Sequence, residues 1–136
     1  ALFKFCKNIF SNKKIDVYNK GNHTRDFTYI DDVVNGIISV LKKPSKNKIP
    51  YQVFNISSNK PIRLINFIRL IEKNIGIKSK KNYINLQKGD IIKTHGSNTK
   101  LAKYSSFNIK TKTDDGIKHF VEWFKNYYIK WITIFF

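Results

Sequence analysis

Hydrophobic residues recur every three or four positions in several segments of the chain, which is the spacing of one face of an α-helix. The first segment predicts an amphipathic helix through Leu2, Phe3, Phe5, Cys6, Ile9 and Phe10. The same spacing predicts a helix opened by Asp31 and Asp32, one introduced by Pro61 and ended by Gly76, and one capped by Thr113 or Asp114. Ser97 is placed to cap a short helix that runs through Tyr104.

Alternating and β-branched residues between these helices predict short strands at residues 15–18, 25–30, 51–56 and 81–86, and residues 87–90 predict a tight polar bend. Strands that alternate with helices favour an α/β fold over a bundle or a sandwich. A chain of 136 residues suffices for one ordinary domain. We expect residues 1–128 to form it and residues 129–136, apolar without helical spacing, to be an atypical tail.

Composition is that of a globular protein, with 41% hydrophobic residues and a mean hydropathy of -0.40. No run approaches the roughly 18 to 20 apolar residues that a membrane-spanning helix needs, and Lys4 and Lys7 interrupt the apolar start. The single cysteine, Cys6, forms no internal disulfide and lies on the apolar face of its helix, so we expect it to be buried. A cytoplasmic location without membrane contact is the expectation.

The formal charge of +17 raises a second class of function, the binding of a polyanion such as nucleic acid. Only Arg25, Arg63 and Arg69 are arginines, whereas phosphate and groove recognition usually uses the arginine fork. The lysines are scattered among asparagines and isoleucines rather than clustered. A basic nucleic-acid-binding module is therefore kept as an alternative and nucleic acid is not the expected partner.

The common catalytic motifs are missing from the sequence. Its six glycines never have the spacing of a dinucleotide-binding or phosphate-binding loop, and no Gly-x-Ser-x-Gly is present. The three histidines are far from one another and from cysteine, so no metal site is expected. The acidic pairs 31–32 and 114–115 are explained by the starts of helices, where the helix dipole favours carboxylates.

Residues 21–32 resist such an account, because a turn-prone loop delivers Arg25 at the start of a predicted strand. An arginine in that place is suited to hold a diphosphate with its planar donor fork. It could equally form an ion pair with a nearby aspartate. The residue types alone leave both interpretations open.

The run Arg-Asp-Phe-Thr-Tyr-Ile-Asp-Asp at 25–32 resembles a signature of the extended short-chain dehydrogenase/reductases that act on nucleotide sugars. The resemblance is greatest to the UDP-glucuronate 4-epimerase group. Further matches lie, in collinear order, at residues 1–5, 15–19, 51–56, 86–90 and 116–124. One departure is Gly96-Ser97, where the family often has a small residue followed by aspartate, and we interpret it as an exchange of one helix cap for another. The other departure is the tail after Tyr128.

This resemblance implies roles for individual residues. Arg25 is implied to contact the substrate diphosphate, and Asp16, Val17 and Tyr18 to lie along the uracil with the tyrosine ring stacked on the base. Asp90 is implied to accept hydrogen bonds from the ribose hydroxyls. Gln87 stands where some relatives have a phosphate-binding arginine, and glutamine there favours the glucuronate group.

The resemblance also implies parts that this sequence does not contain. The family binds NAD on an amino-terminal Rossmann domain and uses a Tyr-x-x-x-Lys pair, and no tyrosine here is followed four residues later by lysine. We therefore expect no catalytic and no cofactor-binding residue in this chain, and no turnover by the chain alone.

The expected fold class is the carboxy-terminal, UDP-sugar-binding portion of an extended short-chain dehydrogenase/reductase, whose partner is the missing Rossmann half. The complete enzyme is expected to be a homodimer that inverts C4 of a UDP-hexuronate through a 4-keto sugar. A decarboxylase or dehydratase on the same scaffold is the alternative. In the chain alone, the apolar faces of residues 25–30, 31–41 and 51–56 are expected to meet water and to leave it poorly folded.

Overall fold

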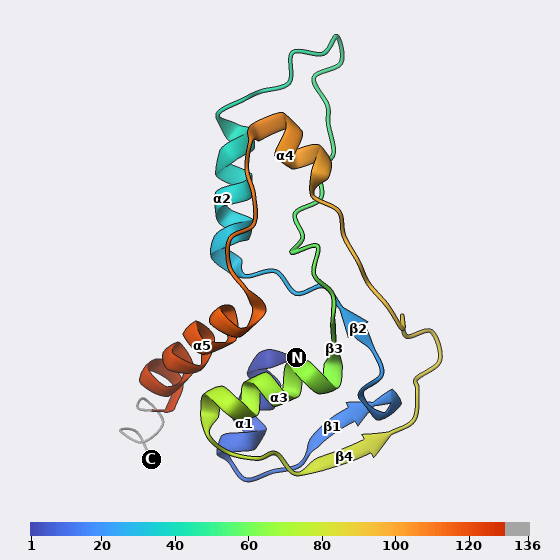
Figure 1. The fold of residues 1–136 in the computed structure, drawn as a ribbon, viewed down its shortest axis with the longest axis vertical. Helices are drawn as coiled ribbons and strands as arrows, with labels where there is room; N and C mark the ends of the chain where they lie inside the picture. The colour runs from blue at the N-terminus through green and yellow to red at the C-terminus, as the bar shows by residue number, and fades with distance from the viewer. Residues whose placement is uncertain (130–136) are drawn as a thin grey trace.

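The computed structural model describes residues 1–129, and in this part of the chain helices predominate over short strands (Figure 1). The helices are α1 (Leu2–Phe10), α2 (Ile30–Leu41), α3 (Leu64–Ile75), α4 (Thr99–Ser105) and α5 (Thr113–Trp123), which continues into the π-helical turn η2 (Phe124–Ile129). The strands are β1 (Ile15–Tyr18), β2 (Thr24–Arg25), β3 (Ile62–Arg63) and β4 (Lys81–Ile84), and a 3-10 turn η1 (Asn19–Gly21) follows β1. The α/β class is confirmed. The predicted tail lies, apart from Ile129, outside the described residues.

The strands form two small pairs rather than one sheet. β1 and β4 run parallel with Ile15 beside Lys81, and β2 and β3 run antiparallel. Side chains of β1 alternate between two faces, so Ile15 and Val17 are buried while Asp16 and Tyr18 remain partly accessible. This alternation gives β1 one face in the core and one face toward a cavity.

The hydrophobic core of the described residues lies between β1 and the helices α1, α3 and α5, in the lower body of Figure 1. Its buried members are Phe5, Cys6, Ile9, Ile15, Val17, Leu64, Phe67, Ile68, Ile71, Ile75, Ile117, Val121 and Phe124. Apart from Phe67 and Ile75, the members that lie on helices are apolar positions whose spacing predicted those helices, while Ile15 and Val17 come from β1. The predicted stop of α3 is confirmed by Gly76 at φ 85°. Burial of Cys6 is confirmed as well.

One carboxylate is buried at the edge of this core. Glu72 on α3 is 4% exposed and accepts hydrogen bonds from the backbone and hydroxyl of Ser79 and from Lys81 Nζ at 2.5 Å. Burial by itself raises the pKa of Glu72, but the hydrogen bonds from Lys81 and Ser79 outweigh it and hold the pKa below its ordinary value. This group ties the end of α3 to the start of β4.

Three predicted strands are shortened or absent, and the smallest difference is at 81–86, where β4 ends at Ile84. Only Thr24 and Arg25 form a strand where residues 25–30 were expected, and residues 51–56 form none. A strand needs a neighbour for its main-chain hydrogen bonds, and no described strand lies beside residues 26–29 or 51–56. The β-type pattern there is therefore not realised as a sheet in this chain.

The predicted helix caps also differ. The residues that precede α2, α4 and α5 are Tyr29, Asn98 and Lys112, and none of them makes a side-chain cap hydrogen bond. Thr113 and Asp114 are therefore not the capping residues, whereas the Ser97 hydroxyl, one position before Asn98, accepts a long hydrogen bond of 3.5 Å from the backbone of Thr99 at the start of α4. Although the acidic pairs do lie in first turns, Asp32 accepts hydrogen bonds from the backbones of Lys110 and Thr111, and Asp114 accepts them from Lys73 and Asn74.

Gly96 has a packing role in the structure. The sequence was interpreted differently, as an exchange of one helix cap for another. A Cβ atom at position 96 would lie 2.5 Å from the Cβ of Ser57, which is closer than real side chains approach. The Gly96 backbone donates to Asp26, whose carboxylate also accepts from Ser58. Glycine thus lets three distant segments cross in contact.

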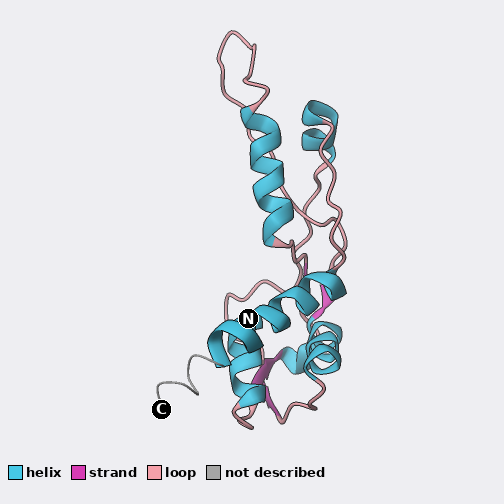
Figure 2. Cartoon of the chain, turned by 90° about the vertical axis from the view of Figure 1, so that its left-hand side faces the viewer, coloured by secondary structure: helices cyan, strands magenta, loops and turns pink. Residues whose placement is uncertain are grey.

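Helices α2 and α4 extend from the lower body as an arm (Figure 2), joined by a hydrogen bond between the hydroxyls of Ser39 and Ser105. Many apolar side chains on and beside α2 are exposed: Ile30, Val34, Ile37, Ile38, Leu41, Ile49, Tyr51 and Val53. We call this set the α2 face. The expected exposure of residues 31–41 and 51–56 is confirmed. Within the described residues, no helix is both long and apolar enough to cross a membrane.

Candidate substrate-binding site

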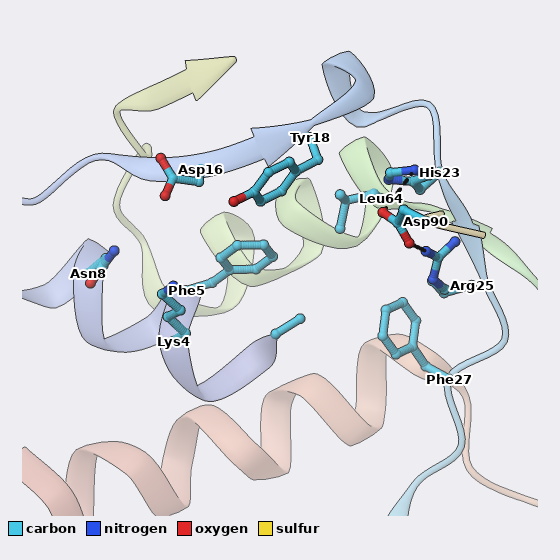
Figure 3. A pocket seen from close by; sticks show the side chains of 11 residues that line it. Lys4, Phe5, Asn8, Asp16, Tyr18, His23, Arg25, Phe27, Leu64 and Asp90 are labelled. Atoms are coloured by element: carbon cyan, nitrogen blue, oxygen red, sulfur yellow. Dashed lines mark hydrogen bonds and ion pairs between the residues drawn. The ribbon is translucent and has the colours of Figure 1, made fainter. Parts of the chain in front are cut away.

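A cavity of about 340 Å³ lies between α1, the accessible face of β1, the start of α3 and the loop that carries Asp90 (Figure 3). Phe5, Phe27 and Leu64 form its apolar part. Its polar and charged residues are Lys4, Asn8, Asp16, Tyr18, His23, Arg25 and Asp90. An apolar wall with a few convergent polar groups is the usual character of a small-molecule site.

Strand β1 supplies two neighbouring polar side chains to this cavity. Asp16 and Tyr18 share one face because side chains alternate along a strand, and Asp16 accepts a hydrogen bond of 2.9 Å from Asn82 on β4. Val17 points the opposite way into the core and is fully buried. Of the three predicted β1 residues, the cavity therefore has two side chains, and any part played by Val17 is limited to its backbone.

Arg25 is held rigidly at the opposite end of the cavity. Its Nη1 donates to the main-chain oxygens of Thr24 and Ile92 at 3.1 and 3.2 Å, and its Nη2 donates to Asp90 Oδ1 at 3.1 Å. Both interpretations left open by the sequence meet here, because Arg25 forms an ion pair with an aspartate and also faces a pocket. The pairing fixes the guanidinium plane and leaves part of its donor fork free.

Asp90 reaches Arg25 from 65 residues away because of the bend at residues 87–90. The Asp90 backbone donates to the oxygen of Gln87 at 3.2 Å, and Gly89 between them adopts φ 82°, which a side chain would disfavour. The predicted polar bend is confirmed. Gln87, in contrast, is exposed and is not among the residues that line the cavity.

The first 57 residues match the model of the NAD dependent epimerase/dehydratase family. Protein CapI of Staphylococcus aureus is 42% identical over 144 aligned residues, which cover 96% of this chain and 43% of that protein. The probable UDP-glucuronate 4-epimerase of Rhizobium meliloti is 32% identical, over 94% of this chain and 42% of its own length. The chain belongs to the NAD dependent epimerase/dehydratase family.

A solved structure supports the same conclusion for the fold. The UDP-glucuronic acid 4-epimerase from Bacillus cereus, crystallised with UDP-glucuronic acid and NAD, superposes with a TM-score of 0.83 and 25% identity. The match covers 93% of this chain and 40% of that one. The chain spans about two fifths of the length of the curated relatives it matches.

Three cavity residues of this family member were not found from the sequence. Lys4 and Asn8 are polar residues four positions apart in the amphipathic helix α1, and this spacing could have placed them on one face. His23 gave no signal, being a lone histidine in a loop, yet its side chain is nearly fully buried beside Asp90. Among residues 1–129 no cluster of histidine, cysteine and acidic side chains is suited to hold a metal ion.

Proposed function

We propose that this chain is the UDP-sugar-binding part of an NAD-dependent nucleotide-sugar 4-epimerase that acts on UDP-glucuronate or a related UDP-hexuronate. The observation that carries the proposal is the rigid Arg25 at one end of a cavity whose other end is formed by Asp16 and Tyr18. A cation at one end and an aromatic ring at the other match the two ends of a nucleoside diphosphate.

In this proposal the uracil lies along β1, with the Tyr18 ring against the base and Asp16 and the Val17 backbone beside its edge. The ribose hydroxyls donate to Asp90, whose side chain is one-third exposed and has acceptor positions beyond those used by its present partners. Arg25 binds the diphosphate. Gln87 is exposed and does not line the cavity, so its contact with the substrate stays a prediction from the family resemblance.

NAD does not fit the residues of this chain. The glycines with positive φ, at 21, 76 and 89, lie in separate turns, and none opens a helix directly after a strand as a dinucleotide loop requires. We therefore assign NAD and the proton-transferring residues of the whole enzyme to a Rossmann half. The α2 face is the surface proposed to pack on that half, since such a face is otherwise costly to leave in water.

Calorimetric titration with UDP, UMP, uridine, GDP and a single-stranded oligonucleotide tests the proposal. UDP should bind most tightly, uridine should lose the contribution of the diphosphate, and GDP should bind poorly because the contacts proposed along β1 are contacts with uracil. Binding of the oligonucleotide in preference to UDP, with an affinity that falls steeply as salt rises, would support the polyanion alternative and overturn the proposal.

For the whole enzyme, the product identifies the reaction. Incubation of UDP-glucuronate with NAD followed by proton NMR of the sugar should reveal the C4 epimer. A pentose would indicate decarboxylation on the same scaffold, and a deoxy-keto sugar would indicate dehydration.

A further inference from the structure

His23 is a buried polar residue at the cavity whose ring nitrogen makes no hydrogen bond within residues 1–129. The residue is 3% exposed, and its Nε2 lies 3.3 Å from Asp90 Oδ2. These two atoms are in contact as an ion pair or a dipole pair, but their directions do not satisfy hydrogen-bond geometry. A buried nitrogen in this condition is uncommon in folded proteins and calls for a functional explanation.

The position of His23 is set by the main chain and not by Asp90. Its carbonyl oxygen accepts a hydrogen bond of 2.7 Å from the backbone of Leu64, at the start of α3, and β2 follows it directly. Because the ring is also buried, the imidazole is a fixed group against which the more exposed carboxylate of Asp90 is placed. A lone pair on Nε2 would be repelled by the carboxylate oxygen that it faces. We therefore assign the ring the tautomer that has its proton on Nε2.

Asp90 is consequently held from two sides. Arg25 Nη2 holds Oδ1 at 3.1 Å, and His23 faces Oδ2, as Figure 3 shows. With either partner removed, the carboxylate is held at one oxygen only and can rotate about the bond to its carbon. A binding group needs such supporting contacts to keep its geometry.

We propose that His23 is the positioning residue that orients Asp90 toward the ribose hydroxyls of the nucleotide. The inference rests on the proposed function, in which Asp90 accepts from those hydroxyls. His23 itself does not touch the ligand in this arrangement. It acts by keeping Oδ2 in place while Arg25, the other partner of Asp90, also binds the diphosphate.

The test compares two substitutions and two nucleotides. In His23→Gln an amide donor reaches the place of Nε2, whereas in His23→Asn the donor falls short of Asp90. His23→Asn should weaken binding of UDP by about tenfold, the scale of losing one polar contact to a charged group, and His23→Gln should restore most of it. Neither change should alter binding of 2′,3′-dideoxy-UDP, which lacks the hydroxyls that Asp90 would accept from.

Equal losses of affinity for UDP and dideoxy-UDP would mean that His23 only supports the fold. Unchanged UDP affinity in His23→Asn would mean that His23 supports nothing at the site. Either result overturns the inference while the proposed function stands. Failure of the unaltered protein to bind UDP overturns both. If the variants do not fold, nitrogen NMR of the histidine rings in the unaltered protein decides. The His23 signals should report an Nε2–H tautomer and shift with UDP but not with dideoxy-UDP, and signals that respond equally to both would refute the role.

Discussion

Replacement of Arg25 by alanine is the most direct perturbation of the proposed diphosphate site. The side chain is one-quarter exposed and its guanidinium is fixed by the carbonyl oxygens of Thr24 and Ile92 and by Asp90. Because these contacts already orient the free donors, a phosphate can be bound with little further ordering of the side chain. Alanine removes the donors and also leaves the Asp90 carboxylate without its cation beside an incoming anion.

The loss of a charge-assisted contact of this kind costs about 2 to 3 kcal/mol. Since 1.4 kcal/mol is about a tenfold change in affinity, Arg25→Ala should weaken UDP binding by about 30- to 150-fold. Arg25→Lys should recover only part of this, because an ammonium group is a point charge and cannot donate in the same plane to phosphate, carbonyl and carboxylate oxygens.

Isothermal titration with UDP and with uridine separates the contribution of the diphosphate from that of the base. Arg69→Ala is the matched control, because Arg69 is exposed on α3 and hydrogen bonds to Asn66 of the same helix. In Arg25→Ala the affinity for uridine should fall by no more than about tenfold, because Asp90 loses one of its two partners at the ribose, and the affinity for UDP should fall further. Both affinities should be normal in Arg69→Ala. Unchanged UDP affinity, or an equal loss for uridine, would refute the diphosphate role and leave Arg25 as a structural partner of Asp90.

Four further predictions concern the rest of the chain. Glu72→Gln should lower the free energy of unfolding by about 3 kcal/mol in urea titrations, because a buried ion pair loses its anion. Since the pKa of Glu72 is depressed in the folded protein, its stabilisation is present above the unfolded-state pKa near 4.3 and is lost as pH falls below that value. A difference in free energy of unfolding between the two proteins that stays constant from pH 6 to pH 3 would contradict this. Gly76→Ala should destabilise the protein by about 1 kcal/mol, because Gly76 has positive φ. Gly21→Ala should destabilise it more, because Gly21 also has positive φ and its added Cβ would lie 3.0 Å from Ile65. Equal urea midpoints for the two variants would count against the packing argument. Burial raises the pKa of the Cys6 thiol to about 12, so a disulfide reagent at pH 8 should react only after denaturant is added, and rapid reaction without it would show that α1 opens readily. Leu41→Lys should change the free energy of unfolding of residues 1–136 by less than about 0.5 kcal/mol, since Leu41 is 73% exposed. The same substitution should lower the melting temperature of the whole enzyme if the α2 face is covered there. Lys42→Gln, at an exposed neighbouring position, is its control.

Several features of this molecule are local, and the sequence was sufficient to predict them. The apolar spacing of α1, α3 and α5 follows from the helical repeat, which depends only on neighbours three or four residues away. Gly76 ends α3 and the bend at 87–90 forms for similarly local reasons of backbone conformation. The alternation along β1 already separated Asp16 and Tyr18 from Val17.

Other features depended on which distant segments come together. Residues 26–29 and 51–56 have the residue types of strands, but a strand exists only where another strand satisfies its main-chain hydrogen bonds, and no described segment does so. The α2 face likewise has the pattern of a buried helix and lies exposed. A periodic pattern shows that a surface is apolar and does not specify which surface covers it.

The cavity itself was decided by tertiary structure. Arg25 could be identified as unusual from its place in the sequence, but its partner Asp90 is 65 residues away and the pairing depends on the path of the intervening chain. His23 is an ordinary polar loop residue in the sequence, and only the packing of β2 against the start of α3 buries its ring beside that carboxylate. The sequence by itself determined the helices, the turns and the family, while the contacts that bring His23, Arg25 and Asp90 together arise from long-range packing that no local pattern encodes.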